Sequence, residues 1–228
     1  MDISDRTNKK FRVAQSKLGT NKGLIIYEEN LQEAVPLIKL GLHKSSKLLH
    51  TNNDVIIDAS ILNDKFIKNR MEGVSGFCPN PYMLSIRINP KALNWKSHVV
   101  GVISHEFSHM VRFQRIVKEK YTILDYLAME GLAQCFETQI TGFVRPYSKA
   151  LTDKEARIVW RKVKKIMHKS GKDLYRRVFL ERKDKVFPHW SGYTISYLIL
   201  NERLHNMKSS WDEIIGMDAK SLIGDGLL

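Results

Sequence analysis

Short apolar runs in the first part of the chain predict β-strands. Leu84, Ile86 and Ile88 alternate with polar residues and would share one face of a strand, which Pro90 would end. The stretch 73–80 is rich in turn-forming residues and is expected to be a loop. The predicted strands are 23–27, 55–57 and 83–89.

Beyond position 90 the apolar residues recur at helical spacing almost to the end of the chain. An earlier helix is expected within 31–49, where Pro36 marks the start of the regular part, and a helical turn within 64–71. The later predicted helices are 97–118, 123–139, 153–168, 172–180 and 191–206, with a short one near Trp211.

Strands that precede helices in the sequence predict an α+β fold, with a small mixed sheet beside a mainly helical C-terminal lobe. Residues 1–20 are polar and basic, and we expect this segment to be disordered in part. Residues 21–228 are expected to form one domain, with a sheet-containing lobe over 21–92 and a helical lobe over 93–228.

Two features indicate a soluble, cytoplasmic protein. The N-terminus lacks the apolar stretch of a secretory signal, and no apolar run approaches the roughly 18 residues that span a bilayer. Cys78 and Cys135 lie far apart and outside any CxxC pair, so we expect two reduced, buried thiols.

The charge balance is strongly basic, with 37 Lys and Arg against 24 Asp and Glu and a net charge of +13. Such a surface attracts anionic partners: nucleic acid, anionic lipid or an acidic polypeptide. Much of the excess lies between Lys154 and Lys185, in a pattern typical of a solvated helix face. Because aromatic residues are not interleaved there as a stacking platform, nucleic acid is the less favoured partner.

The sequence His105-Glu106-Phe-Ser-His109 is an HExxH motif within an expected helix. Residues four apart lie on one helix face, so both imidazoles can bind one tetrahedral zinc ion. Glu106 can then act as the general base that takes a proton from water. The apolar residues before the motif suit a buried helix, and Ser97 is a candidate N-cap.

A catalytic zinc site needs a third protein ligand. The metzincin continuation is absent because Arg112 and Arg115 replace its Gly and His. Glu130, 21 residues after His109, is the preferred candidate, because that spacing allows the first helix to end and a second to return antiparallel. Small residues next to Glu130, including Gly131, would let the second helix approach the first closely.

Several other residues are candidates for the same site. Glu137 lies one heptad beyond Glu130 and is the rival ligand, while His98 is expected to be a packed or outer-shell residue. Asp125 is either a helix N-cap or an acceptor for a histidine N–H. The tetrahedral oxyanion of amide hydrolysis needs a hydrogen-bond donor. We expect Tyr193 in this role, with His189 and Tyr197 as alternatives, although these aromatic residues could also be core packing.

Three blocks carry a family resemblance: HEFSH, LDYLAMEGLAQCFE and FPHWSGYTISYLI. Together, over about 25–215, they resemble the bacterial family catalogued as domain of unknown function 2268 and described as predicted zinc-dependent proteases. The resemblance implies a zincin-like fold of the gluzincin type, with His105, His109 and Glu130 as zinc ligands and Glu106 as base. Ser196, which stands where the family pattern has a second small Gly, is a departure that bears on helix packing.

The leading hypothesis is a zinc metallopeptidase that acts on a peptide or protein substrate, with an acidic substrate permitted by the charge. The alternative is a non-catalytic, zinc-stabilised protein whose basic surface binds an acidic protein or nucleic acid. A zinc hydrolase for a non-peptide amide is a third reading. Strand 83–89 is either an exposed edge that pairs with the substrate backbone or an internal strand.

Overall fold

The computed structural model describes residues 9–224. The chain divides between Gln114 and Arg115 into two compact units, here called the sheet unit (1–114) and the helical unit (115–228). The mixture of a five-stranded sheet with many helices confirms the predicted α+β class. Within the described residues, no helix combines the length and the apolar character needed to cross a membrane.

The sheet unit is built on a mixed sheet in the order β1-β2-β3-β5-β4. The two outer pairs, β1/β2 and β4/β5, are antiparallel, whereas β2, β3 and β5 run parallel to one another. This agrees with the predicted mixed sheet. The strands are β1 (Phe11–Leu18), β2 (Asn21–Glu28), β3 (Val55–Ile61), β4 (Val74–Asn80) and β5 (Met83–Ile88).

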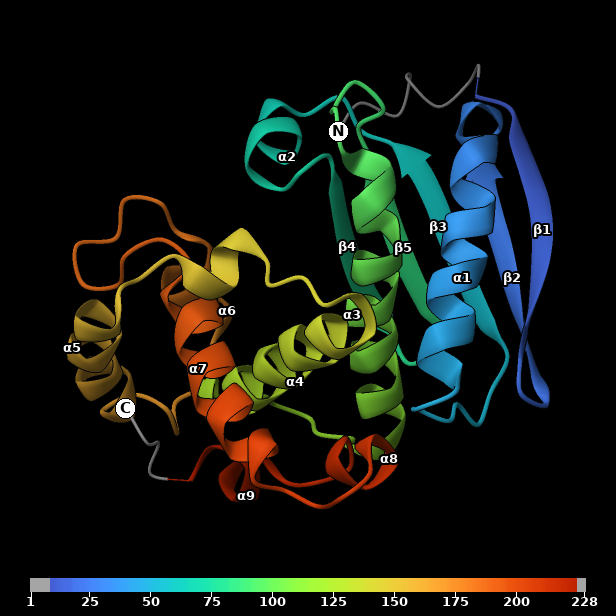
Figure 1. The fold of residues 1–228 in the computed structure, drawn as a ribbon. Helices are drawn as coiled ribbons and strands as arrows, with labels where there is room; N and C mark the ends of the chain where they lie inside the picture. The colour runs from blue at the N-terminus through green and yellow to red at the C-terminus, as the bar shows by residue number, and fades with distance from the viewer. Residues whose placement is uncertain (1–8, 225–228) are drawn as a thin grey trace. The chain divides into compact units, whose positions relative to one another are not determined.

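Two helices of the sheet unit lie side by side along one face of the sheet (Figure 1). They are α1 (Val35–Ser46) and α3 (Trp95–Arg115). Only the last residue of α3, Arg115, belongs to the helical unit. They approach closely because Gly41 of α1 faces Ile103 of α3, where a methyl group on Gly41 would come within 2.8 Å of Ile103. The remaining helical segments are η2 (Glu29–Ala34) and α2 (Lys65–Arg70).

The position of β5 corrects one expectation. Leu84, Ile86 and Ile88 share a buried face as predicted, but β5 pairs with β3 on one side and β4 on the other. The reading of 83–89 as an exposed edge is therefore wrong, and β4 is the terminal strand of the sheet. Part of the stretch expected to be a loop, 73–80, forms this strand instead.

The N-terminal segment contains a strand that was not predicted from the sequence. Residues 11–18, within the polar segment 1–20, form the strand β1, while residues 1–8 lie outside the described part. β1 is a terminal strand with mostly exposed side chains. Such a strand needs few apolar residues, because its backbone hydrogen bonds to β2 hold it in place.

The helical unit is organised around two packed helices, α4 (Ile123–Thr141) and α7 (Ser191–His205). A methyl group on Gly131 of α4 would lie 2.6 Å from the carbonyl oxygen of Ser196 on α7. Glycine at 131 therefore allows α4 to pack closely against α7. From the sequence it was expected to allow a close approach to the HExxH helix instead. The other elements are η3 (Pro146–Lys149), α5 (Asp153–Lys164), α6 (Lys172–Tyr175), the π-helical η4 (Arg176–Leu180), α8 (Trp211–Ile214) and α9 (Ala219–Ile223).

The helix starts are set by local capping. Thr122 is the N-cap of α4 and forms a capping box with Asp125, so Asp125 stands at the third helical position and not at the N-cap. Lys118 also forms an ion pair with Asp125. Ser97 is not the start of α3, which begins two residues earlier; its hydroxyl donates to the carbonyl of Asn94.

Candidate metal centre

The HExxH motif lies in the middle of α3, as the sequence predicted. His105, Glu106 and His109 are all buried, and the two imidazole centroids are 4.7 Å apart in an edge-on arrangement. The preceding residues of α3, including Val102 and Ile103, are buried in the core. A rigid helix with one face in the core thus fixes the spacing of the two imidazoles.

Glu106 lies directly against the terminal strand β4. A methyl group on Gly76 of β4 would come within 2.4 Å of Cγ of Glu106 and 2.5 Å of its Oε1. Burial, and next the charge of Glu106, raise the pKa of the Cys78 thiol on the same strand. Glycine at 76 therefore leaves the space that the Glu106 carboxylate occupies.

Glu130 lies buried near the middle of α4. The hydroxyl of Tyr175, on α6, donates a hydrogen bond of 3.3 Å to Oε1 of Glu130. Tyr193, on α7, packs edge-on against Phe179, with the ring centroids 5.3 Å apart. Burial, and next the charge of Glu130, raise the pKa of both phenols, so both remain protonated at neutral pH. Tyr175 was not among the residues predicted from the sequence.

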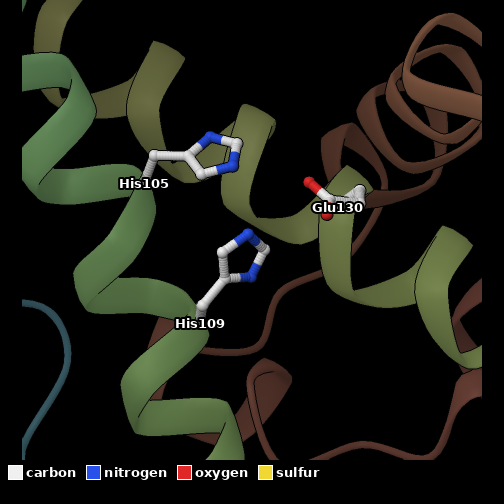
Figure 2. Close-up of side chains that lie close together, drawn as sticks. All are labelled: His105, His109 and Glu130. Carbon is white, nitrogen blue, oxygen red and sulfur yellow. The ribbon is translucent and has the colours of Figure 1, made fainter. Parts of the chain in front are cut away.

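Figure 2 shows His105, His109 and Glu130 as one group, with the imidazoles projecting from α3 and the carboxylate from α4. Each of the three residues offers one potential ligand atom, and these three atoms lie within 4.8 Å of one another. Two imidazoles and one carboxylate are a donor set that suits catalytic zinc, which takes three protein ligands and keeps a fourth position open. The residues present therefore fit the metal that the motif implies.

The rival ligand Glu137 is engaged elsewhere in the helical unit. Its Oε1 lies 3.6 Å from Nε of Arg145, and its Oε2 accepts a hydrogen bond from Tyr147 at 3.3 Å. Both Glu137 and Arg145 are only 2% exposed, so this is a buried ion pair. In the sheet unit, Nδ1 of His98 lies 3.4 Å from Oε2 of Glu72. Neither Glu137 nor His98 is among the three grouped residues.

The oxyanion candidates lie at the start of α7. Trp190, just before the helix, has a left-handed backbone with φ of 67°, which is unfavourable for a bulky residue by about 1–3 kcal/mol. The imidazole of His189 stacks on the Trp190 ring at 4.2 Å. Tyr197 is buried. A strained residue beside His189 is typical of functional sites.

Comparisons with known proteins identify a family and a related protein. The family model described as "Predicted Zn-dependent protease (DUF2268)" matches residues 37–224. A curated relative, the uncharacterised protein YjfC of Bacillus subtilis (strain 168), is 25% identical over 164 residues, which cover 67% of this chain and 54% of the relative. The chain thus spans about half the length of this relative.

Two solved structures are similar to this chain over most of its length. An aminopeptidase N family protein from Idiomarina loihiensis superposes with a TM-score of 0.53 and 10% identity, over 94% of this chain and 43% of that one. An M1 zinc metallopeptidase from Deinococcus radiodurans gives a TM-score of 0.44 and 13% identity, over 96% and 46% of the two chains. The likeness to the Idiomarina protein, at 10% identity, concerns the fold alone. Because the family model spans most of the chain, the protein belongs to the family described as predicted Zn-dependent proteases, DUF2268.

Proposed function

We propose that this chain is a zinc metallopeptidase in which His105, His109 and Glu130 hold the metal and Glu106 is the general base. The observation that carries the proposal is the grouping of two imidazoles and a carboxylate next to a retained glutamate of the HExxH motif. A purely structural site would need the three ligands but not Glu106. Membership of a family described as predicted proteases gives independent support.

Bound zinc would supply a Lewis acid that acidifies water and polarises the scissile carbonyl. Glu106 would take the proton from the attacking water and deliver it to the leaving amine. The carboxylate is suited to this task because Gly76 and the backbone of β4 confine it on one side. His189 or Tyr193 would donate a hydrogen bond to the oxyanion as negative charge develops there.

The substrate backbone would pair with β4. This strand is at the end of the sheet, and its Gly76 lies against Glu106, so a peptide added along the strand would pass close to the base. Phe77 of β4 is 65% exposed and offers an apolar contact for a substrate side chain. Backbone pairing of this kind suits a peptide in extended conformation.

A peptide-library cleavage assay tests the proposal. The zinc-loaded wild type is expected to cleave peptides, and Glu106→Gln is expected to bind zinc equally well but to lose at least about 100-fold in kcat. Removal of zinc with a chelator should abolish cleavage, and added zinc should restore it. Equal cleavage by wild type and Glu106→Gln would refute the assignment of Glu106.

The basic surface favours a second candidate function, a non-catalytic protein that binds an acidic partner. α5 exposes a series of cationic side chains, and the neighbouring 169–185 segment adds more. Cleavage that persists at high salt but stops on chelation would favour the peptidase. Binding to nucleic acid or an acidic protein that weakens steeply with salt, without cleavage, would favour this second function. The exposed cations of α5 are Lys154, Arg157, Arg161, Lys162 and Lys164.

A further inference from the structure

A hydrogen bond inside the helical unit ends on Glu130. Tyr175 donates to Oε1 of Glu130 at 3.3 Å. The two residues come from α6 and α4, so a separate segment of the chain reaches this carboxylate. A carboxylate has two oxygens with several lone pairs, and a hydrogen bond to Oε1 therefore leaves acceptor capacity for a metal.

The ring of Tyr175 is held by its neighbours independently of its hydroxyl. It stacks on Phe179 at 4.8 Å with the planes 21° apart, and it packs against Tyr126 at 4.5 Å. Phe179 lies in the π-helical segment η4, which follows α6 directly. π-Helical turns are rare and occur often at functional sites. Removing only the hydroxyl of Tyr175 should thus leave the packing intact.

A phenol has one hydrogen to donate. The hydrogen of Tyr175 is directed to Glu130. Partners that hydrogen-bond to a metal ligand fix its orientation, and their loss usually weakens metal binding by about 10–100-fold. Tyr175 thus meets the requirements for a residue that acts through the ligand and not on the substrate.

We propose that Tyr175 is a positioning residue that orients Glu130 toward the metal. This inference rests on the proposed function, because it takes Glu130 as a zinc ligand. It has a consequence for catalysis: the single hydroxyl hydrogen of Tyr175 is committed to Glu130, so the oxyanion donor is to be sought among His189 and Tyr193.

Zinc affinity, measured by competition with a chromophoric chelator, tests the inference. Tyr175→Phe is expected to bind zinc about 10–100-fold more weakly than the wild type. Tyr193→Phe leaves the hydrogen bond between Tyr175 and Glu130 in place and should bind zinc within about twofold of the wild type. Tyr126→Phe is the matched control: its ring packs on Tyr175, but its hydroxyl forms no side-chain hydrogen bond with another residue of the described part. It should bind zinc within about twofold of the wild type.

The outcomes separate this inference from the proposed function. No zinc binding by the wild type would overturn both. Zinc binding that is lost in Glu130→Gln but unchanged in Tyr175→Phe would overturn only the positioning role. Melting temperatures of the metal-free variants check that Tyr175→Phe is as well folded as Tyr126→Phe.

Discussion

Gly76 on β4 and Glu106 on α3 are in such close contact that no side chain fits between them: a methyl group on Gly76 would lie 2.4 Å from Cγ of Glu106. A Cβ at this position would displace the carboxylate, because the backbone of β4 is held by its pairing with β5. The terminal strand therefore determines where the proposed general base lies.

Gly76→Ala should reduce kcat by about 10–100-fold while zinc content stays at the wild-type level, because the base is displaced and the ligands are not. Steady-state kinetics and metal analysis of the same preparation would measure this. Gly23→Ala is the matched control in the same sheet, since its methyl group would meet side chains only at 3.4 Å and beyond. Wild-type kcat in Gly76→Ala would contradict the proposed role of Glu106.

Gly131→Ala should destabilise the protein by about 1–3 kcal/mol. The sign of this change in the free energy of unfolding is informative, because Gly→Ala within a helix, where no neighbour obstructs the methyl group, stabilises a protein by about 0.5–1 kcal/mol. Here the added methyl group would meet the Ser196 carbonyl oxygen at 2.6 Å and force α4 and α7 apart. Chemical denaturation measures the difference. Gly216→Ala, whose methyl group meets nothing closer than 3.7 Å, should be neutral, and a neutral Gly131→Ala would contradict this packing.

Both thiols should react slowly in the folded protein. Burial raises the pKa of Cys135, and burial together with the charge of Glu106 raises that of Cys78. A raised pKa lowers the fraction of reactive thiolate at pH 8, so an aromatic disulfide reagent should react at least about 10-fold more slowly than with the unfolded chain. Both are free and buried, as the sequence predicted. Rapid labelling of either thiol in the native protein would contradict its burial.

Elements with strong local signals were predictable from the sequence. α4 begins and ends close to the expected positions because Thr122 and Asp125 form a capping box and Gly142 ends the helix with a left-handed backbone. The start of α5 was predictable for the same reason, because the helix begins with a capping box between Thr152 and Glu155, although it ends at Lys164, four residues before the predicted end. These signals lie within a few residues of the helix ends they determine.

The two terminal strands were not predictable in the same way. β4 contains Gly76 and Pro79, which usually indicate a turn. A terminal strand tolerates proline because one side of its backbone needs no partner in the sheet. The glycine is explained by Glu106, a residue distant in sequence. β1 was missed because its side chains are mostly exposed and carry little apolar pattern.

The candidate site, too, was predictable from the sequence only where its residues lie close together along the chain. The HExxH motif is contained within one helix turn, so its geometry followed from the sequence. Spacing in the sequence favoured Glu130 as the third ligand but did not exclude Glu137, because both lie on α4. What sets Glu137 apart is its contact with Arg145 and Tyr147, which lie beyond the end of the helix. Tyr175 is 45 residues from Glu130, and no local signal connects the two.

Zinc content of the purified protein tests the central claim most directly, with wild type, Glu130→Gln and Glu137→Gln measured side by side. Glu137→Gln is the matched control, because it removes a buried carboxylate from the same helix. It should destabilise the fold by about 3–5 kcal/mol, because it removes one charge of the buried ion pair with Arg145, but should not affect the metal. We predict one zinc per chain in the wild type and in folded Glu137→Gln, and loss of zinc in Glu130→Gln. Zinc retained in Glu130→Gln, or absent from the reconstituted wild type, would contradict the account.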